Sequence, residues 1–257
     1  MENEIIDSLG SDARAKEHQK LFDDYFKPFK GRKHDSLVTE MLGRGLFVTF
    51  NQLENRNGIL IIGANPSFGE EDKKNFMKTP KELYESPKGY WRKIVELATK
   101  FPESSYEAAY LDLFPIKHTK LHEFENAFKT LNDIKAKMLQ VTHAEMVKMN
   151  PKVIINFFQK TAYYWGFNTR KTNYCNEELP WMGYRFEKVK SEGLNVYRII
   201  GWSDSKESII ANDAGGRLSI GTYIIFLSQS RDVQSLEARN KRREYLLAFL
   251  KEYNITF

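Results

Sequence analysis

Four consecutive aliphatic residues, Ile59–Ile62, stand between two glycines and are followed closely by Asn65-Pro66. This apolar run constrains the fold more than any other stretch. Continuous aliphatic and β-branched residues predict a strand that is buried on both faces. Such strands occur in parallel sheets that helices cover on each side. The run therefore predicts an α/β fold around a central, mostly parallel sheet.

Similar apolar runs recur along the chain and alternate with segments of helical periodicity. Further strands are expected at Ala108–Phe114, Val153–Phe158, Val196–Trp202 and Tyr223–Leu227, with a short edge strand within residues 44–50. Helices are expected over residues 11–27, 90–101, 122–149 (as one helix or two) and 236–253, the last with Ser235 as N-cap. Residues 64–90 read as a long loop and residues 160–195 as irregular. Strands separated by helices predict βαβ units.

The chain of 257 residues shows no repeat and no Gly/Ser-rich linker, so a single domain over residues 1–257 is expected. No apolar run approaches the roughly 20 residues that cross a bilayer, and the acidic start MENEIIDSLG does not resemble a secretory signal. The only cysteine, Cys175, excludes an internal disulfide and a four-cysteine metal site within one chain. We expect a cytoplasmic protein with no membrane partner, no cofactor and no metal.

The chain carries a mild positive charge. The formal net charge is +5 and the sequence pI is about 9.0, with basic clusters at residues 27–33, 170–171 and 241–243. This excess is compatible with nucleic-acid binding but does not require it, because charge runs are usually solvated surfaces.

Ligands of parallel sheets bind beyond the carboxyl ends of the strands, which directs attention to Gly63-Ala64-Asn65-Pro66-Ser67. The stretch matches neither the dinucleotide fingerprint nor the phosphate loop. Proline restricts the residue before it to extended conformations, so Pro66 would present Asn65 at the top of the sheet. The alternative is an ordinary Asn-Pro turn.

Leu60–Ser67 resembles the first motif of the uracil-DNA glycosylase superfamily, in which Gly-x-Asp-Pro or Gly-x-Asn-Pro ends the first core strand. Three weaker patterns follow in the family's order: Tyr110–Pro115, Asn150–Ile155 and Ile224–Ser230. The resemblance covers roughly residues 58–160 and 222–252. It implies a three-layer α/β/α fold with about four core strands, to which residues 1–45 add a helical extension.

The resemblance also implies an activity, the hydrolysis of the N-glycosidic bond of a flipped base. Asn65 would position the attacking water, as the Asp or Asn of this motif does in the family. Because a neutral amide cannot take a proton, a carboxylate from Glu70, Glu71 or Asp72 would be needed for a fast reaction. Around the base, the resemblance implies a binding site made of Gly63, Ala64, Pro66 and Ser67, with Phe76 or Phe68 stacking on the base.

Two positions depart from the family pattern. Asp112 stands where many members carry the Asn that reads the edge of uracil, and an ionised Asp only accepts hydrogen bonds. It would oppose uracil O4 and favour a base with an exocyclic amine. Ser228-Gln229 stands where the family places a His, so Ser228 or Gln229 would donate a weaker bond to the base oxygen. Ser230 and Arg231 fit a phosphate-contacting loop, although Asp232 would repel DNA.

Two other groups of residues have more than one interpretation. His118 and His122 have i, i+4 spacing but lack the Glu of a zincin motif, and His118 either faces the site or is exposed. The aromatic run Tyr163–Phe167, followed by Arg170-Lys171, is either part of the core or a stacking platform for single-stranded nucleic acid.

Three functional hypotheses follow. The first is a monomeric DNA glycosylase that acts on a damaged or modified base, in single-stranded or duplex DNA. The second is a weak or inactive nucleic-acid-binding protein on the same fold. The third is a small-molecule hydrolase or transferase that uses the same crevice, supported only by the general α/β geometry.

Overall fold

The computed structural model describes the arrangement of just over half of the chain. The described residues are 20, 23–24, 27, 36–44, 48–49, 58–66, 77–78, 109–118, 120–167, 181–203, 208–209, 216–227 and 236–255. The expected helix over residues 90–101 and the proposed N-cap Ser235 lie outside these ranges, as does most of the expected helix over residues 11–27.

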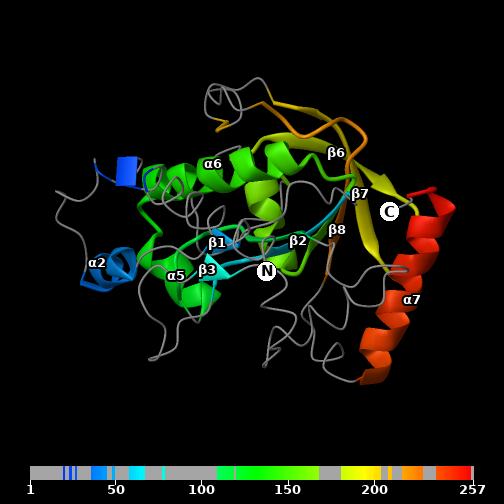
Figure 1. Ribbon diagram of the computed structural model, residues 1–257, viewed down its shortest axis with the longest axis horizontal. Coiled ribbons are helices and arrows are strands. Elements are labelled where there is room, and N and C mark those ends of the chain that lie inside the picture. The colour runs from blue at the N-terminus through cyan, green and yellow to red at the C-terminus, as the bar shows by residue number, and fades with distance from the viewer. Residues whose placement is uncertain are drawn as a thin grey trace, which may run out of the picture.

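The described residues form a mixed α/β structure around a six-stranded sheet (Figure 1). In spatial order the strands are β4 (Ala109–Asp112), β2 (Ile59–Gly63), β5 (Val153–Asn156), β8 (Tyr223–Phe226), β7 (Asn195–Trp202) and β6 (Tyr184–Val189). The first four are parallel to one another, β7 pairs antiparallel with β8, and β6 pairs antiparallel with β7. A separate parallel pair joins β1 (Val48–Thr49) to β3 (Met77–Lys78).

The described helices are α2 (Ser36–Gly43), α5 (Leu121–Ala127), α6 (Asn132–Met149), the 3-10 helix η2 (Gln159–Trp165) and α7 (Leu236–Glu252). Helix α6 ends at Asn150, whose left-handed backbone (φ 43°) closes the last turn by donating to Met146 O and Val147 O. Pro151 follows directly and cannot continue a helix, so the chain passes into β5.

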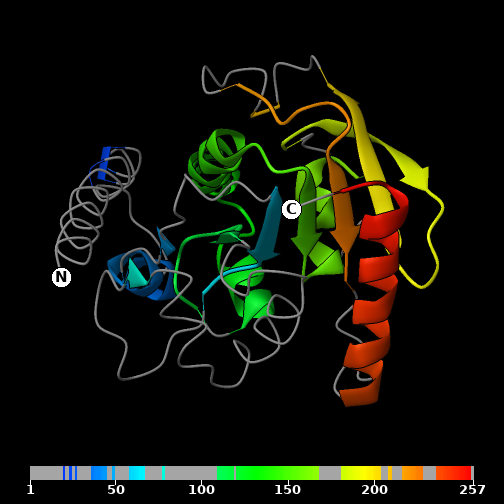
Figure 2. The same cartoon turned by 45° about the vertical axis from the view of Figure 1, so that its right-hand side comes forward.

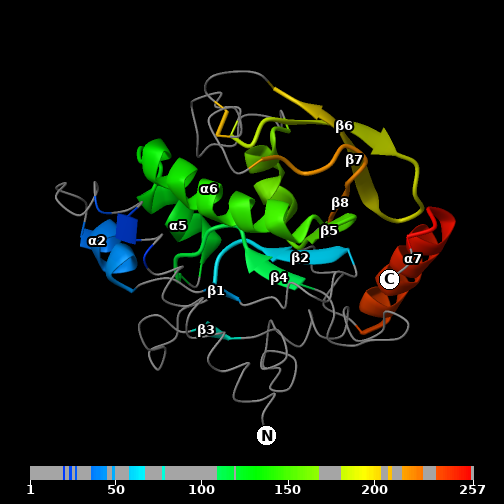
Figure 3. The same cartoon turned by 45° about the horizontal axis from the view of Figure 1, so that its top comes forward.

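Alternate strand residues face two different groups of helices. Leu60, Ile62 and Ile154 pack in a cluster with residues of α5 and α6, whereas Ile61 and Ile155 pack in a second cluster with residues of α7. Figures 2 and 3 show α6 and α7 on opposite sides of the strands. Because β2 and β5 are apolar on both faces, they are completely buried, as expected for the inner strands of a parallel sheet.

The structure corrects the predicted elements in three places. The sheet has six strands rather than about four, and β6 lies in the segment that we expected to be irregular. Tyr184 is its one buried residue, and β6 is an edge strand with only β7 beside it. The expected loop over residues 64–90 contains the two-residue strand β3, whereas residues 122–149, expected as one helix or two, form the two helices α5 and α6.

No helix among the described residues is long and apolar enough to cross a membrane.

Candidate functional site

The segments that leave β2 and β4 run side by side beyond the end of the sheet. The N–H of Leu113 donates to Gly63 O (3.0 Å), and the N–H of Phe114 donates to Ala64 O (2.8 Å). The N–H of His118 donates to Pro66 O (2.8 Å). Backbone bonding therefore fixes the Asn-Pro turn against the turn that follows β4, at the carboxyl edge where α/β proteins bind their ligands.

Gly63 and Asp112 are partners in the register of β2 and β4. Because Tyr110 lies two residues before Asp112, both side chains point to the same face of β4, and the Tyr110 hydroxyl donates to Asp112 Oδ1 (2.8 Å). A Cβ atom on Gly63 would lie closer than 3.0 Å to both Asp112 Oδ1 and the Tyr110 hydroxyl. Because Gly63 has no side chain, there is space for the hydrogen bond between Tyr110 and Asp112.

The Asp112 carboxyl group is buried, with 7% of the residue exposed. No described residue hydrogen-bonds to its second oxygen, Oδ2. Burial raises the pKa of Asp112 from 3.8 to about 7, although the hydrogen bond from Tyr110 acts in the opposite direction. At neutral pH a large share of Asp112 is therefore a neutral acid, which can donate a hydrogen bond from Oδ2 as well as accept one.

Asn65 lies two residues beyond Gly63 and is partly exposed. Its Nδ2 group donates to His118 O and makes a longer contact of 3.4 Å with Pro66 O. A carbonyl oxygen only accepts, so this bond identifies which atom of the carboxamide is the nitrogen. The acceptor Oδ1 consequently lies on the other side of the group.

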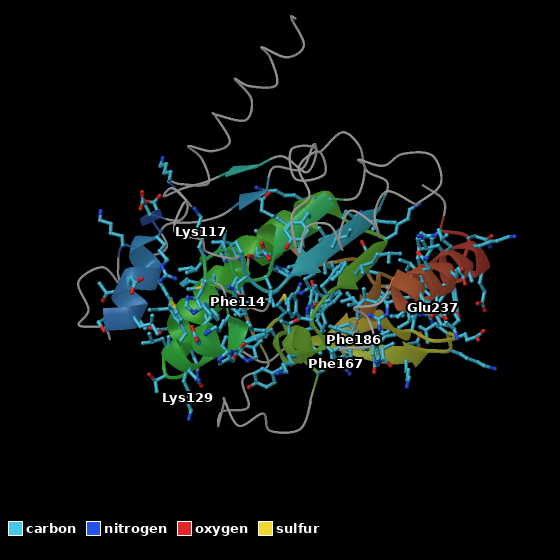
Figure 4. The ribbon with its side chains drawn as sticks, turned by 90° about the horizontal axis from the view of Figure 1, so that it is seen from below. Phe114, Lys117, Lys129, Phe167, Phe186 and Glu237 are labelled. Atoms are coloured by element: carbon cyan, nitrogen blue, oxygen red, sulfur yellow. The ribbon has the colours of Figure 1, made fainter. Side chains whose placement is uncertain are left out.

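His118 is buried, with 7% of the residue exposed, so the interpretation as an exposed histidine was wrong. Its ring bonds to Arg44 on one side and to Glu123 on the other. The neighbouring Lys117 is also buried (Figure 4), and its carbonyl accepts a bond from Arg44 Nη1 (3.2 Å). No group of three metal-ligating side chains occurs in the described part of the chain, so a zinc site at His118 and His122 finds no support there.

A second polar residue ends β5. Asn156 is completely buried, and its Oδ1 accepts from the N–H of Phe158 (3.0 Å) and from Thr161 Oγ1 (3.0 Å). Because Asn156 is registered with Ile62 and Asp112 with Gly63, the two polar side chains belong to opposite faces of the sheet. Asn156 fixes the start of η2 and is separate from the Asp112 pair.

The aromatic run that follows β5 belongs to the core. Tyr164 and Trp165 are 3% and 0% exposed, and Tyr164 packs edge-on against Phe114 at 4.8 Å between ring centroids. Phe167 stacks on Phe186 at 4.3 Å (Figure 4). The core interpretation of this run is therefore correct for the residues described, whereas Arg170 and Lys171 lie outside them.

Helix α7 carries three consecutive basic residues, Lys241, Arg242 and Arg243. In Figure 2, α7 runs antiparallel to β8, so that its first turns lie at the carboxyl ends of the parallel strands. Lys241 is exposed and approaches the ring of Tyr245 (5.8 Å), while Arg242 is half-buried, and burial lowers its pKa.

Several predicted site residues fall outside the described ranges. They are Ser67, Phe68 and Phe76 after the first motif, and Ser228, Gln229, Ser230 and Arg231 after β8, together with the acidic residues 70–72. Of the predicted site residues, Gly63, Ala64, Asn65 and Pro66 are described, and they lie beside the segment that follows Asp112.

Three residues of this region, Tyr110, Arg44 and Glu123, were not predicted from the sequence. For Tyr110 a signal existed, because Tyr-x-Asp at the end of a strand places both side chains on one face. For Arg44 no signal existed, since 74 residues separate it from His118.

No family model matches the chain, and no curated protein sequence matches it.

Proposed function

We propose that the chain is a DNA glycosylase-like enzyme that flips a damaged or modified base and hydrolyses its N-glycosidic bond, on a three-layer fold of the uracil-DNA glycosylase type. The observation that carries the proposal is the Asp112 carboxyl group. It is buried at the carboxyl end of β4, and its Oδ2 has no bond from the described residues. A ligand that supplies a polar atom there would satisfy a group that is otherwise costly to bury.

The raised pKa of Asp112 changes which base this position suits. An ionised Asp112 would oppose uracil O4, but the neutral acid offers one donor and one acceptor, like the carboxamide of Asn. Near neutral pH the site therefore suits a carbonyl oxygen flanked by a ring N–H, as in uracil, xanthine and hypoxanthine. Above pH 7 the ionised form would favour an exocyclic amine.

The two strand-end residues have complementary roles in this reaction. The leaving base gains negative charge as the bond between C1′ and the base nitrogen breaks, and the Oδ2–H of Asp112 stabilises that charge by donating a hydrogen bond. Asn65 Oδ1 accepts a hydrogen bond from the water whose oxygen attacks C1′. The proton that the water loses passes to solvent, and the departing base takes up a proton from solvent.

The direct test is incubation with oligonucleotides that carry one uracil, xanthine, hypoxanthine or hydroxymethyluracil, followed by alkali. Strand cleavage at the modified position supports the proposal, provided that an Asp112→Ala/Asn65→Ala double variant leaves the same substrate intact. Absence of cleavage of all four substrates at enzyme in excess of DNA would contradict it.

A nucleic-acid-binding protein without base release is the second candidate. Two observations favour it: the Asn65 amide is already bonded to His118 O, and the chain carries a formal net charge of +5. This candidate predicts a DNA affinity that falls steeply with salt, with no free base in the supernatant. Affinity independent of salt would count against it.

A further inference from the structure

His118 joins three segments that are far apart in the sequence. Arg44, which follows α2, lies with Nη1 2.9 Å from His118 Nδ1. Glu123, in the first turn of α5, lies with Oε2 2.9 Å from His118 Nε2. Figure 1 shows α2 and α5 on the same side of the molecule. The buried ring is thus held from two directions by charged side chains.

The two partners determine which ring nitrogen carries the proton. A guanidinium group only donates, so the Nδ1 atom that faces Arg44 must be the acceptor. The proton is then on Nε2, which donates to the Glu123 carboxylate. Lys120 supports this arrangement from outside, because its bond to Glu123 Oε1 (2.7 Å) and the bond from His118 together lower the pKa of Glu123.

The backbone of His118 contacts the Asn-Pro turn twice. Its N–H donates to Pro66 O (2.8 Å), and its carbonyl oxygen accepts from Asn65 Nδ2. All four polar atoms of His118 are therefore engaged, two by charged side chains and two by the Asn-Pro turn. A residue fixed at every polar atom can set the orientation of the carboxamide that it holds.

We infer that His118 is a positioning residue for Asn65, and that Arg44, directly after α2, holds His118 in place. Arg44 bonds both to His118 Nδ1 and to Lys117 O (3.2 Å), so it fixes the turn after β4 through one side chain and one carbonyl. With Nδ2 bonded to His118 O, the Oδ1 acceptor of Asn65 is directed away from this contact. Arg44 thereby controls the orientation of the Asn65 carboxamide through His118, without contacting Asn65 itself.

The chain offers a matched control for Arg44. Glu40 contacts the same guanidinium group through Nη2 (2.5 Å), but its side chain is 61% exposed, whereas that of Arg44 is 12% exposed. Glu40→Ala removes a charge and a bond from Arg44 without touching His118. Arg44→Ala removes the bonds to His118 and Lys117. The two variants therefore separate the positioning contact from a surface ion pair.

The first test needs no activity. The side-chain NH₂ signals of Asn65 are assigned by NMR from their loss in Asn65→Asp, and their hydrogen exchange is measured. Arg44→Ala is expected to shift these signals and speed their exchange at least tenfold. Glu40→Ala should leave the Asn65 signals and their exchange unchanged. The exchange of the Leu60 backbone amide should be the same in both variants as in the wild type. Arg44→Lys, which keeps a donor, should restore part of the protection. Unchanged Asn65 signals in Arg44→Ala would overturn the inference. If that variant does not fold, His118→Gln takes its place with the same expected shift.

The second test rests on the proposed glycosylase activity. Arg44→Ala should lower the rate of base release at saturating DNA tenfold or more and leave the Kd for DNA within about twofold. A loss confined to Kd would show that Arg44 contacts DNA instead, and would overturn the inference. If the wild-type protein releases no base, the proposed function fails, and the NMR result alone decides whether His118 positions Asn65.

Discussion

Gly63 and Asp112 face each other across β2 and β4, and the space that a side chain on Gly63 would occupy is taken by the hydrogen bond between Tyr110 and Asp112. The absence of a side chain on one strand is thus what allows a buried carboxyl group on the next. Four predictions follow from this relationship and from the position of Asn65 beside it.

Gly63→Ala is expected to destabilise the protein by about 1–3 kcal/mol, because the added methyl group overlaps Asp112 and Tyr110 in a packed region. Urea denaturation measures the change in the free energy of unfolding. Gly43→Ala is the matched control, since a Cβ there meets nothing within 4 Å, and its effect should be neutral or slightly stabilising. Equal effects of the two variants would contradict the steric argument.

The stability of the wild-type protein should fall as pH rises from about 4 to 7. Asp112 is protonated in the folded state up to about pH 7 but ionises near pH 3.8 in the unfolded state, so in this range the folded state binds more protons. Between pH 5 and pH 8 the free energy of unfolding should fall by about 3 kcal/mol more than in Asp112→Asn, which cannot ionise. Urea titrations of both proteins at the two pH values measure this difference, and parallel curves would contradict it.

Base release should fall as pH rises above about 7, since the donor at Asp112 is lost on ionisation. Tyr110→Phe removes a hydrogen bond that lowers the pKa of Asp112, so the fall should move to higher pH. Single-turnover rates from pH 5 to pH 9 measure both effects. In Asp112→Asn the rate should not fall with rising pH. If the rate still falls in that variant, another titrating group causes the fall.

Asn65→Ala should lower the single-turnover rate of base release by about 100-fold or more, because it removes the acceptor for the attacking water. Since Asn65 is partly exposed, its loss should change the free energy of unfolding by no more than about 1 kcal/mol, the typical net value of one hydrogen bond. Asn126→Ala, at an exposed position of α5, is the control. A rate within twofold of wild type would exclude Asn65 from the chemistry.

The central strands were predictable because their signal is local. The apolar run of β2 and the Asn-Pro turn after it are visible in the sequence, and burial on both faces leaves little choice of residue. The edge strand β6 was missed because it follows a long aromatic segment and because its exposure does not alternate regularly, with an irregularity between Arg185 and Phe186. Without a clear period of two, a short strand carries only a weak local signal.

The state of the site could not be predicted from the sequence, because it depends on contacts between distant segments. Asp112 was expected to be ionised, as an aspartate in water is. Its pKa is raised by burial among side chains from other strands and helices, which no local pattern encodes. The role of His118 depends likewise on Arg44 and Glu123, which approach it from two separate helical regions.

The backbone bonds between the two strand-end turns have a consequence for how this chain can vary. Three carbonyl groups of residues 63–66 each receive an N–H from residues 113–118, in the same order along both segments. An insertion or deletion between the bonded residues of either turn would displace the bond between His118 and Pro66. A loop graft at this edge of the sheet must therefore keep the ends of both turns paired.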